Sequence, residues 1–368
     1  MDFQVASEMK SLVLDTRSRL LVLAPHPDDE SLATGGLLQQ AVAQGAAARI
    51  VFLTHGENNP WAQRLREKRW RIKAPDRQRW GRLRQEEALR ALAALGLLPS
   101  CAEFWGFPDQ SLTPGLLAGG GEILPRLVDQ IERWRPSLLA APSMLDLHPD
   151  HNALGVLMSL ALGQIRSPDL RPDGVAYVVH CRDPFPAADG AMSLSLSPQQ
   201  QATKRRAILS HATQLAFLPG RFLKHAGAQE TYLPLAWPAI SSAIPLPIRR
   251  AAVVDGHLHL DLRPRWHLGA FGPITILLLA VRAGRVQRSL QGRLPLWIGR
   301  RFAPLDLWDV LAGASGGQAR CRRSHQDIHL ELPLSAFGQA DNVFCKIKRA
   351  HGFFDEAGWQ ELSLGAVS

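Results

Sequence analysis

The stretch Leu20-Leu21-Val22-Leu23-Ala24-Pro25-His26-Pro27-Asp28-Asp29-Glu30 decides the fold, because an apolar run of strand length ends in a packet of polar side chains. A short, uninterrupted apolar run predicts a strand that is buried on both faces. The next segment, Ser31–Ala43, carries its apolar residues at helical spacing, and a second apolar run covers Arg49–Thr54. Strand, helix and strand in this order predict a βαβ unit with parallel strands.

The same alternation continues through the first half of the chain. Gly96 and Pro136 stand where two of the helices are expected to end. We therefore predict an α/β fold, a mostly parallel sheet with helices on both faces, in which ligands bind beyond the carboxyl ends of the strands. Further helices are expected at Arg82–Leu95, Ile123–Trp134 and Ala153–Ile165, and further strands at Cys101–Trp105, Leu138–Pro142 and Val175–His180.

The pattern changes after about residue 238. Prolines between Pro234 and Pro247 fit a linker, and the apolar–polar alternation beyond them predicts strands without a strong helical stripe. We expect a catalytic domain over residues 1–238 and a β-rich, sandwich-like accessory domain over residues 239–368, whose role the sequence leaves open. Its strands are expected at His257–Leu262, Ile274–Val281, Asp327–Leu332 and Val343–Ile347.

The composition favours a cytoplasmic enzyme. The 368 residues are 46% hydrophobic, which is enough for a sizeable core, and no apolar run is long enough for a transmembrane segment. Met1–Leu20 lacks the apolar centre of a signal peptide. The four cysteines are scattered without a C-x-x-C pair, as expected of ordinary thiols in a reducing compartment rather than of a cysteine-rich zinc site.

A net charge of +9 favours an anionic partner, and part of the excess is local. Over residues 60–83, the basic insertion, arginines and lysines crowd together with Trp61, Trp70 and Trp80 interleaved. We interpret this insertion as a lid or rim that meets an anionic, sugar-containing substrate, because arginine binds phosphate bidentately. A solvated charged helix is the simpler alternative. Peripheral contact with a membrane stays open, as does a non-enzymatic nucleic-acid-binding protein, although nucleic acid is not the expected partner.

Two packets of metal-capable side chains stand at predicted strand ends, His26 to Glu30 and His148-Pro-Asp-His151. Because the carboxyl ends of parallel strands meet at one edge of a sheet, the two packets can converge. Catalytic zinc takes three protein ligands and keeps one open position. His26, Asp29 and His151 are the expected ligands.

The remaining polar residues of the two packets suit proton transfer. Asp28 is placed as the general base, and His148 as a second acid/base or electrophile that Asp150 orients. The purely structural alternatives are that Asp28-Asp29-Glu30 caps a helix and that His148 and His151 are a pair of surface side chains. The ligand set also tolerates iron(II), which leaves a two-histidine, one-carboxylate oxygenase as a competing class.

The two packets together resemble the PIG-L/LmbE-like de-N-acetylase family. The resemblance extends over three further motifs: Arg84-x-x-Glu87, Pro108-Asp109-x-x-Leu112, and a late helix with Lys204, Ala207, His211 and Gln214. It implies a Rossmann-like fold with a catalytic zinc and hydrolysis of N-acetylglucosaminyl groups. It assigns the metal ligands and the base as above, makes His148 the transition-state partner, and makes Arg84 and Asp109 candidate substrate contacts. His55, which follows the second strand, is a candidate for the pocket wall.

We therefore expect hydrolysis of the acetamide of a GlcNAc-type amino sugar. A phosphate- or lipid-linked glycan, such as a lipopolysaccharide-core intermediate, would suit the basic insertion; a small metabolite or antibiotic glycoside is the alternative. The insertion and the β-rich tail depart from the family's short catalytic pattern. They bear on the substrate rather than on the chemistry.

Overall fold

The computed structural model describes residues 12–181, 190–216, 219–235, 247–263, 274–294, 299, 301–324, 327–350 and 352–365. The chain folds into two compact units. The first unit comprises Met1–Leu112, Ile131–Ser143 and Ser167–Ala236, and the second comprises Thr113–Gln130, Met144–Arg166 and Trp237–Ser368. The predicted boundary at residue 238, with most of the predicted linker, lies outside the described residues.

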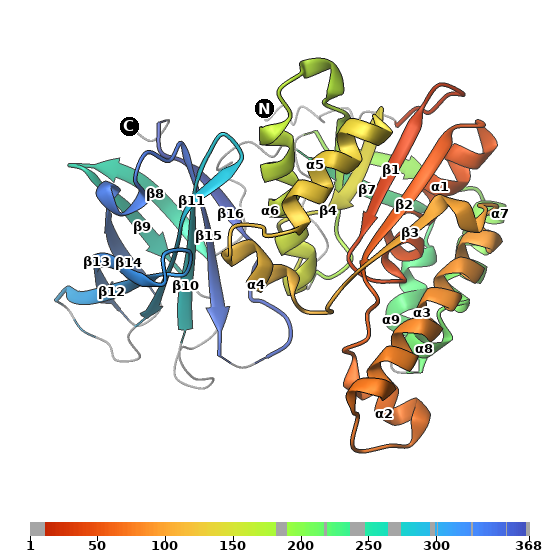
Figure 1. Cartoon of the computed structure of the whole chain (residues 1–368), viewed down its shortest axis with the longest axis horizontal. Coiled ribbons are helices and arrows are strands. Elements are labelled where there is room, and N and C mark those ends of the chain that lie inside the picture. The colour runs from red at the N-terminus through yellow and green to blue at the C-terminus, as the bar shows by residue number, and fades with distance from the viewer. Residues whose placement is uncertain are drawn as a thin grey trace, which may run out of the picture. The chain divides into compact units, whose positions relative to one another are not determined.

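The first unit contains a mixed sheet of strand order β3-β2-β1-β4-β5-β7-β6. Its parallel part is β1 (Arg19–Ala24), β2 (Ala47–Thr54), β3 (Ala102–Phe107), β4 (Leu138–Pro142) and β5 (Asp173–Tyr177) (Figure 1). Each of the five lies within two or three residues of its predicted position, and their order is that of a doubly wound α/β sheet. β7 (Gln229–Pro234) and β6 (Met192–Ser195) add an antiparallel edge that the sequence did not indicate.

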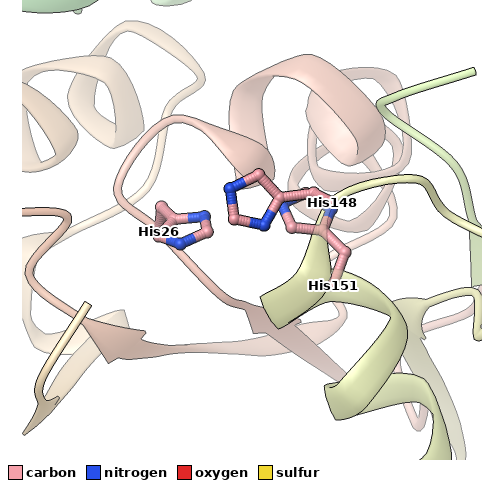
Figure 2. Close-up of side chains that lie close together, drawn as sticks. All are labelled: His26, His148 and His151. Atoms are coloured by element: carbon pink, nitrogen blue, oxygen red, sulfur yellow. The ribbon is translucent and has the colours of Figure 1, made fainter. Parts of the chain in front are cut away.

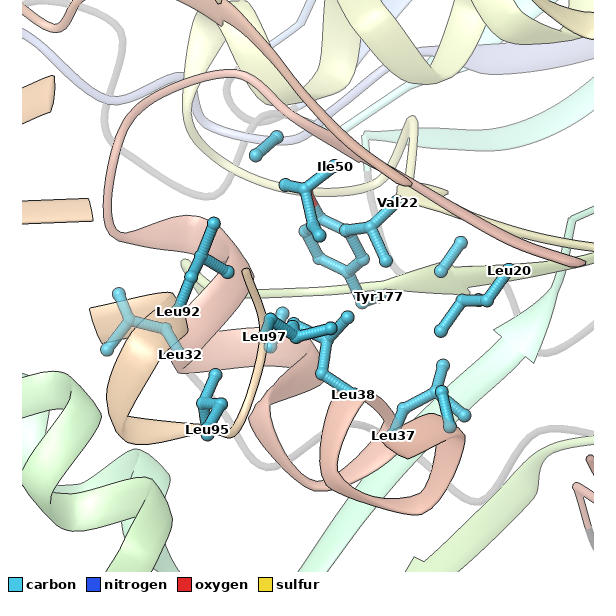
Figure 3. Packing of buried hydrophobic residues seen from close by; sticks show 14 of the residues in the cluster. Leu20, Val22, Leu32, Leu37, Leu38, Ile50, Leu92, Leu95, Leu97 and Tyr177 are labelled. Atoms are coloured by element: carbon cyan, nitrogen blue, oxygen red, sulfur yellow. The ribbon is translucent and has the colours of Figure 1, made fainter. Parts of the chain in front are cut away.

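Helices of this unit bury an apolar layer against the sheet. α1 (Asp29–Ala43) packs on β1 and β2, and Leu37 and Leu38 contribute to the core shown in Figure 3. α3 (Ala74–Ala94) begins eight residues earlier than the predicted start at Arg82, so the end of the basic insertion is helical. The other helices here are α2 (Pro60–Glu67), α7 (Pro198–Leu209), α8 (Ala212–Leu215) and α9 (Pro219–Leu223).

The second unit groups two helices with the C-terminal sheet. α4 (Leu112–Leu117) and α6 (Pro149–Gln164) carry residues of this unit, while α5 (Ile123–Trp134) is divided between the two. α6 starts four residues before its predicted start at Ala153, because Pro149 occupies its first turn. The motif His148 to His151 therefore forms the beginning of the helix. None of the described helices is long and apolar enough to cross a membrane.

The C-terminal region is β-rich as predicted, but the sandwich-like arrangement is wrong. The nine described strands pair antiparallel in one sheet of order β16-β15-β10-β11-β12-β13-β14-β9-β8. Ile248 N–H, on one edge strand, donates to Gln360 Oε1 on the other at 3.3 Å, so the sheet curls around a single core. An alternation of apolar and polar residues predicts one buried face for a strand, both in a sandwich and in a single curled sheet. The sequence pattern therefore could not distinguish the two arrangements. The strands are β8 (Ile248–Val254), β9 (His257–Leu262), β10 (Ile274–Arg282), β11 (Arg285–Leu294), β12 (Ala303–Asp309), β13 (Ala314–Arg323), β14 (Ile328–Pro333), β15 (Asn342–Arg349) and β16 (Gln360–Ser363).

Candidate metal and catalytic site

The turn between β1 and α1 holds His26 between two carboxylates. Its Nδ1 lies 3.3 Å from Asp29 Oδ2, and its Nε2 lies 3.2 Å from Asp109 Oδ1. The backbone N–H of His26 also donates to Asp29 Oδ2 at 2.9 Å. All three side chains are nearly excluded from solvent. These contacts fix the orientation of the imidazole relative to the two carboxylates.

Asp28 occupies a strained backbone position at the start of α1. Its φ is 152°, a value that costs energy for a residue with a side chain. The backbone N–H of Asp28 donates to Glu30 Oε2 at 3.0 Å, and its carboxylate Oδ2 lies 3.1 Å from Arg84 Nη2. Strain of this kind persists where surrounding contacts over-determine the conformation, as they do here.

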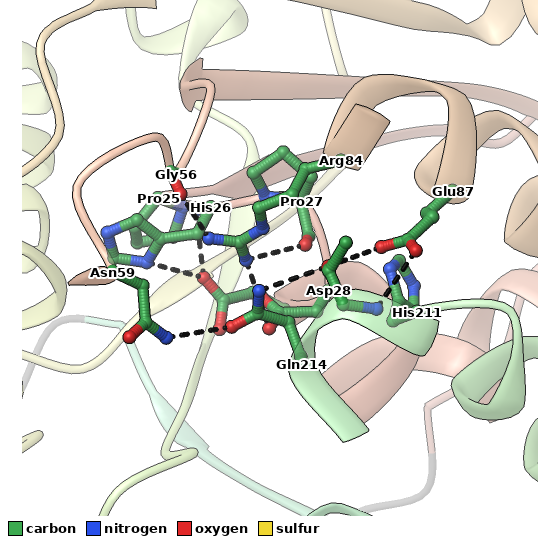
Figure 4. A network of polar contacts seen from close by, with 12 residues as sticks. Pro25, His26, Pro27, Asp28, Gly56, Asn59, Arg84, Glu87, His211 and Gln214 are labelled. Carbon is green, nitrogen blue, oxygen red and sulfur yellow. Dashed lines mark hydrogen bonds and ion pairs between the residues drawn. The ribbon is translucent and has the colours of Figure 1, made fainter. Parts of the chain in front are cut away.

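Arg84, on α3, is the centre of this network (Figure 4). Its guanidinium donates to the carbonyl oxygens of Gly56 at 2.7 Å and Pro27 at 2.8 Å, besides the ion pair with Asp28. Gly56 has φ +60°, and a Cβ there would lie 1.9 Å from Arg84 Nη1. Arg84 is 3% exposed. These contacts hold Arg84 against Asp28, and its predicted contact with the substrate stays a prediction.

Burial raises the pKa of Asp28 to about 6. The Arg84 guanidinium opposes this change, the neighbouring Asp29 adds to it, and His211 opposes it. A carboxyl group that changes charge near neutral pH is suited to taking up and returning a proton.

His211, one of the residues of the late-helix motif, contacts the first turn of α1. Its Nε2 lies 3.1 Å from Glu30 Oε1 and 3.2 Å from Ser31 Oγ. Burial disfavours the charged imidazole, but Glu30 outweighs that effect and the pKa of His211 is raised. The match of His211 to a family motif was the signal that could have identified it.

Asp109 and His55 lie on the loops that follow β3 and β2. Asp109 Oδ2 accepts the N–H of Asn58 at 2.9 Å. Burial would raise the pKa of Asp109, but His26 and Arg84 hold it below its usual value. His55 is half-buried beside Phe104 and Gly106, and burial lowers its pKa. Its place in the pocket wall stays a prediction.

Asp146, which the sequence patterns did not indicate, contacts both histidines of the segment His148–His151. Asp146 Oδ1 accepts the N–H of His148 at 2.8 Å, and its Oδ2 lies 3.2 Å from His151 Nδ1. Asp146 and His151 are fully buried. A carboxylate that orients a metal-binding imidazole is a common supporting group. Its position two residues before the motif was the available signal.

His148 caps α6 with its ring. Its Nδ1 accepts the backbone N–H of Asp150 at 3.1 Å, so the proton of the neutral ring is on Nε2. The backbone of Asp150 orients His148, and an orienting role for the Asp150 carboxylate stays a prediction.

Figure 2 shows the imidazoles of His26, His148 and His151, whose ring nitrogens lie within 4.8 Å of one another. The same spacing relates Asp29, His151 and His180, and also His26, Asp109 and Asp150. Each of the predicted ligands His26, Asp29 and His151 belongs to at least one of these groups, but none of the three groups contains all of them, so the ligand set stays a prediction. His180 was not predicted; its place just after β5 was the only signal.

Comparisons with known proteins identify one matching family model and several similar deacetylases. Residues 21–162 match the family model described as PIG-L: GlcNAc-PI de-N-acetylase. The chain is similar to the 1D-myo-inositol 2-acetamido-2-deoxy-alpha-D-glucopyranoside deacetylase of Corynebacterium glutamicum, with 26% identity over 262 residues, covering 63% of this chain and 89% of the relative. The protein of the same name from Nakamurella multipartita is 29% identical over 276 residues, covering 64% and 93%.

Solved structures of deacetylases are also similar. A deacetylase from the biosynthesis pathway of teicoplanin matches with a TM-score of 0.47 and 20% identity, covering 59% of this chain and 97% of that one. The N,N'-diacetylchitobiose deacetylase from Pyrococcus horikoshii matches with a TM-score of 0.44 and 18% identity, covering 59% and 84%. The family match confirms the resemblance predicted from the motifs, because residues 21–162 match the PIG-L family model.

Proposed function

We propose that this protein is a metal-dependent hydrolase that removes the acetyl group from an N-acetylated amino sugar and releases acetate. The observation that carries the proposal is the grouping of buried imidazoles, His26, His148 and His151, in a chain whose Asp28 is a buried carboxylate held by Arg84. The PIG-L match and the deacetylase relatives support de-N-acetylation as the reaction.

The donor set fits a divalent metal ion. His26, Asp29 and His151 would hold it, and imidazole with carboxylate suits zinc as well as iron(II). Asp146 and Asp109 each lie close to one of the imidazoles and fix its orientation. When bound, the metal lowers the pKa of the attacking water and polarises the amide carbonyl.

Asp28 is the proton carrier in this proposal. As a carboxylate it takes a proton from the water that attacks the acetamide carbon. As a carboxylic acid it returns the proton to the nitrogen of the leaving amine, so the C–N bond breaks and a neutral amine and acetic acid form. The acetic acid then loses its proton to solvent and is released as acetate. Arg84 keeps Asp28 in place and favours its ionised form at the start of each cycle.

His148 stabilises the charge that develops on the carbonyl oxygen. Because its Nδ1 accepts the Asp150 N–H, a neutral His148 ring carries its proton on Nε2, and in this proposal that N–H donates to the oxygen of the tetrahedral intermediate. A neutral imidazole serves as this electrophile without first taking up a proton. Its role as the helix cap fixes the direction of the donor.

The basic insertion supports an anionic substrate. Trp61 and Trp70 are 62% and 78% exposed, and Arg64 lies over both rings, with its Cζ 5.0 Å and 5.8 Å from their centroids. The insertion starts directly after Asn58 and Asn59, and Asn58 is bonded to Asp109 of the site. Exposed aromatic and guanidinium groups next to the site suit a phosphate-bearing sugar.

Some of the arginines in the insertion already have partners. Arg69 donates to Asp76 at 2.7 Å, and Arg79 bonds to Asp76 and Glu67. The exposed Arg71 and Arg77 are therefore the better choice for substitution.

The test is acetate release from a panel of N-acetylated amino sugars, each offered free, phosphate-linked and lipid-linked. Wild type should release acetate, and Asp28→Ala should lower kcat by about two to four orders of magnitude without loss of fold. Arg71→Ser/Arg77→Ser should raise KM for the phosphate-linked sugar and spare the free one. Acetate release by Asp28→Ala at the wild-type rate would contradict the mechanism, and equal effects on both substrates would contradict the anionic substrate.

A further inference from the structure

The C-terminal domain is joined to the His148 loop by its backbone. Asp355 N–H donates to Leu147 O at 2.9 Å, and Trp359 N–H donates to Met144 O at 2.7 Å. Gly358 lies so close to this loop that a Cβ on it would be 1.9 Å from Met144 O. The segment 355–359 is thus fitted against the residues that lead into the catalytic motif.

A buried ion pair extends this junction to the residue after His151. Lys346 Nζ donates to Asn152 Oδ1 at 2.8 Å and also pairs with Asp355. Asn152 Nδ2 in turn donates to Asp355 Oδ2 at 2.9 Å and to Asp146 O at 3.0 Å. Asp146 is the carboxylate that contacts both His148 and His151. A continuous set of polar contacts therefore runs from β15 to the two histidines.

The position of Lys346 in its strand is unusual for a domain that folds around its own core. Residues alternate across a strand, and Val343, Cys345 and Ile347 of β15 point into that core. Lys346 therefore lies on the opposite face, yet it is only 1% exposed. Burying a lysine is costly unless its partners are well arranged. A pair retained at such cost is better explained by what it positions than by stability.

The same loop places an aromatic ring beside His148. The Phe353 ring stands edge-on to the His148 imidazole, with 4.9 Å between the centroids. Phe353 is also 51% exposed, so much of its ring faces solvent. An aromatic ring in this place offers an apolar surface to a ligand that binds beside the His148 imidazole.

We infer that the C-terminal domain is part of the active site: Lys346 and Asp355 are positioning residues for the loop of His148 and His151, and Phe353 contacts the substrate. This inference rests on the proposed function, since it assigns both histidines to that site. Lys346 and Asp355 act through Asn152 and Asp146 and do not touch the substrate. Phe353 instead forms a wall against the apolar face of the sugar or its aglycone.

The experiment measures zinc affinity by chelator competition, kcat and KM for acetate release, and the thermal midpoint. The variants are Asp355→Asn, which keeps the shape of the side chain, and Lys346→Met/Asp355→Leu, which replaces the pair by apolar groups. The control is Asp309→Asn, because this buried carboxylate of the same sheet bonds to Ser289, Arg288 and the turn after β12. Phe353→Ala and Phe353→Tyr test the aromatic wall.

Both pair variants should weaken zinc affinity about 10- to 100-fold and lower kcat by a similar factor, because supporting partners of metal ligands typically have effects of that size. Asp309→Asn should lower the thermal midpoint and leave zinc affinity and kcat close to wild type. Phe353→Ala should raise KM about tenfold with zinc affinity unchanged, a change of the size expected for one lost aromatic contact, and Phe353→Tyr should restore KM.

Two results would overturn the inference. One is wild-type zinc affinity and kcat in a folded Asp355→Asn or Lys346→Met/Asp355→Leu protein. The other is an unchanged KM in Phe353→Ala. If the wild-type protein itself binds no metal or releases no acetate, the proposed function fails instead, so the two failures are distinguishable.

Discussion

Replacing Arg84 by methionine should separate the role of this buried cation from ordinary packing. The apolar stem of the side chain is retained, while the donors to Gly56 O and Pro27 O and the partner of Asp28 are lost. Arg82→Met is the matched control, because Arg82 is an exposed residue of the same helix and undergoes the same chemical change.

The magnitude follows from the contacts. Removing one member of a buried ion pair costs about 3–5 kcal/mol, because the other charge stays buried without a partner. Each buried carbonyl that loses its donor adds about 1–3 kcal/mol, although these costs overlap when the site relaxes. Asp28 can reduce the cost by taking up a proton, since its pKa rises further without Arg84. We expect a loss of about 4 kcal/mol for Arg84→Met and below about 0.5 kcal/mol for Arg82→Met.

The assay combines urea unfolding with the pH profile of kcat/KM. A raised pKa of Asp28 means that a smaller fraction of the base is ionised at neutral pH, so the acidic limb of the profile should move to higher pH in Arg84→Met. Arg84→Met/Asp28→Asn should recover part of the lost stability, because no uncompensated charge remains. Stability within about 1 kcal/mol of wild type, together with an unmoved profile, would refute this reasoning.

Three further outcomes are expected. The raised pKa of His211 means that its charged form stabilises the fold below about pH 6.5, and that this contribution is lost as the pH rises through the folded-state pKa. His211→Asn should therefore lose more unfolding free energy at about pH 6 than at about pH 9. An equal loss at both pH values would contradict the assignment. Burial raises the pKa of the Cys345 thiol to about 12, whereas Cys181 is exposed; a thiol reagent should label Cys181 in the native protein and reach Cys345 only after denaturation, as peptide mapping would show. Gly56→Ala should cost about 2 kcal/mol or more and lower kcat, because its Cβ meets Arg84 at a positive φ; urea unfolding at the wild-type midpoint would count against that contact.

The parts of the fold that follow local patterns could be predicted from the sequence. β1 and its polar turn were predicted because a fully apolar run stops abruptly at His26. The start of α6 was misplaced because Pro149 is read as a breaker, although proline is favoured in the first turn of a helix. The antiparallel edge of β6 and β7 was missed because both strands are short and rich in polar residues.

The supporting contacts of the site could not be predicted in this way. Arg84 shares its sequence environment with exposed arginines, and only the face that it occupies on α3 makes it the buried partner of Asp28. The Lys346–Asn152 contact joins residues 194 positions apart, for which a local pattern carries no information. Most of the metal-capable residues were predictable because they are clustered in sequence, whereas the contacts that Lys346 and Asp355 make near them come from a distant part of the chain.

The most direct test of the central claim is a titration of metal-free protein with zinc while acetate release from an N-acetylated amino sugar is followed. We predict that activity is absent without metal and rises in proportion to added zinc. It should saturate at about one equivalent per chain, as expected for a single catalytic site with three protein ligands. His26→Ala and His151→Ala should remain folded and show neither tight binding nor activity. Full acetate release by the metal-free protein, or wild-type activity in either histidine variant, would contradict the account.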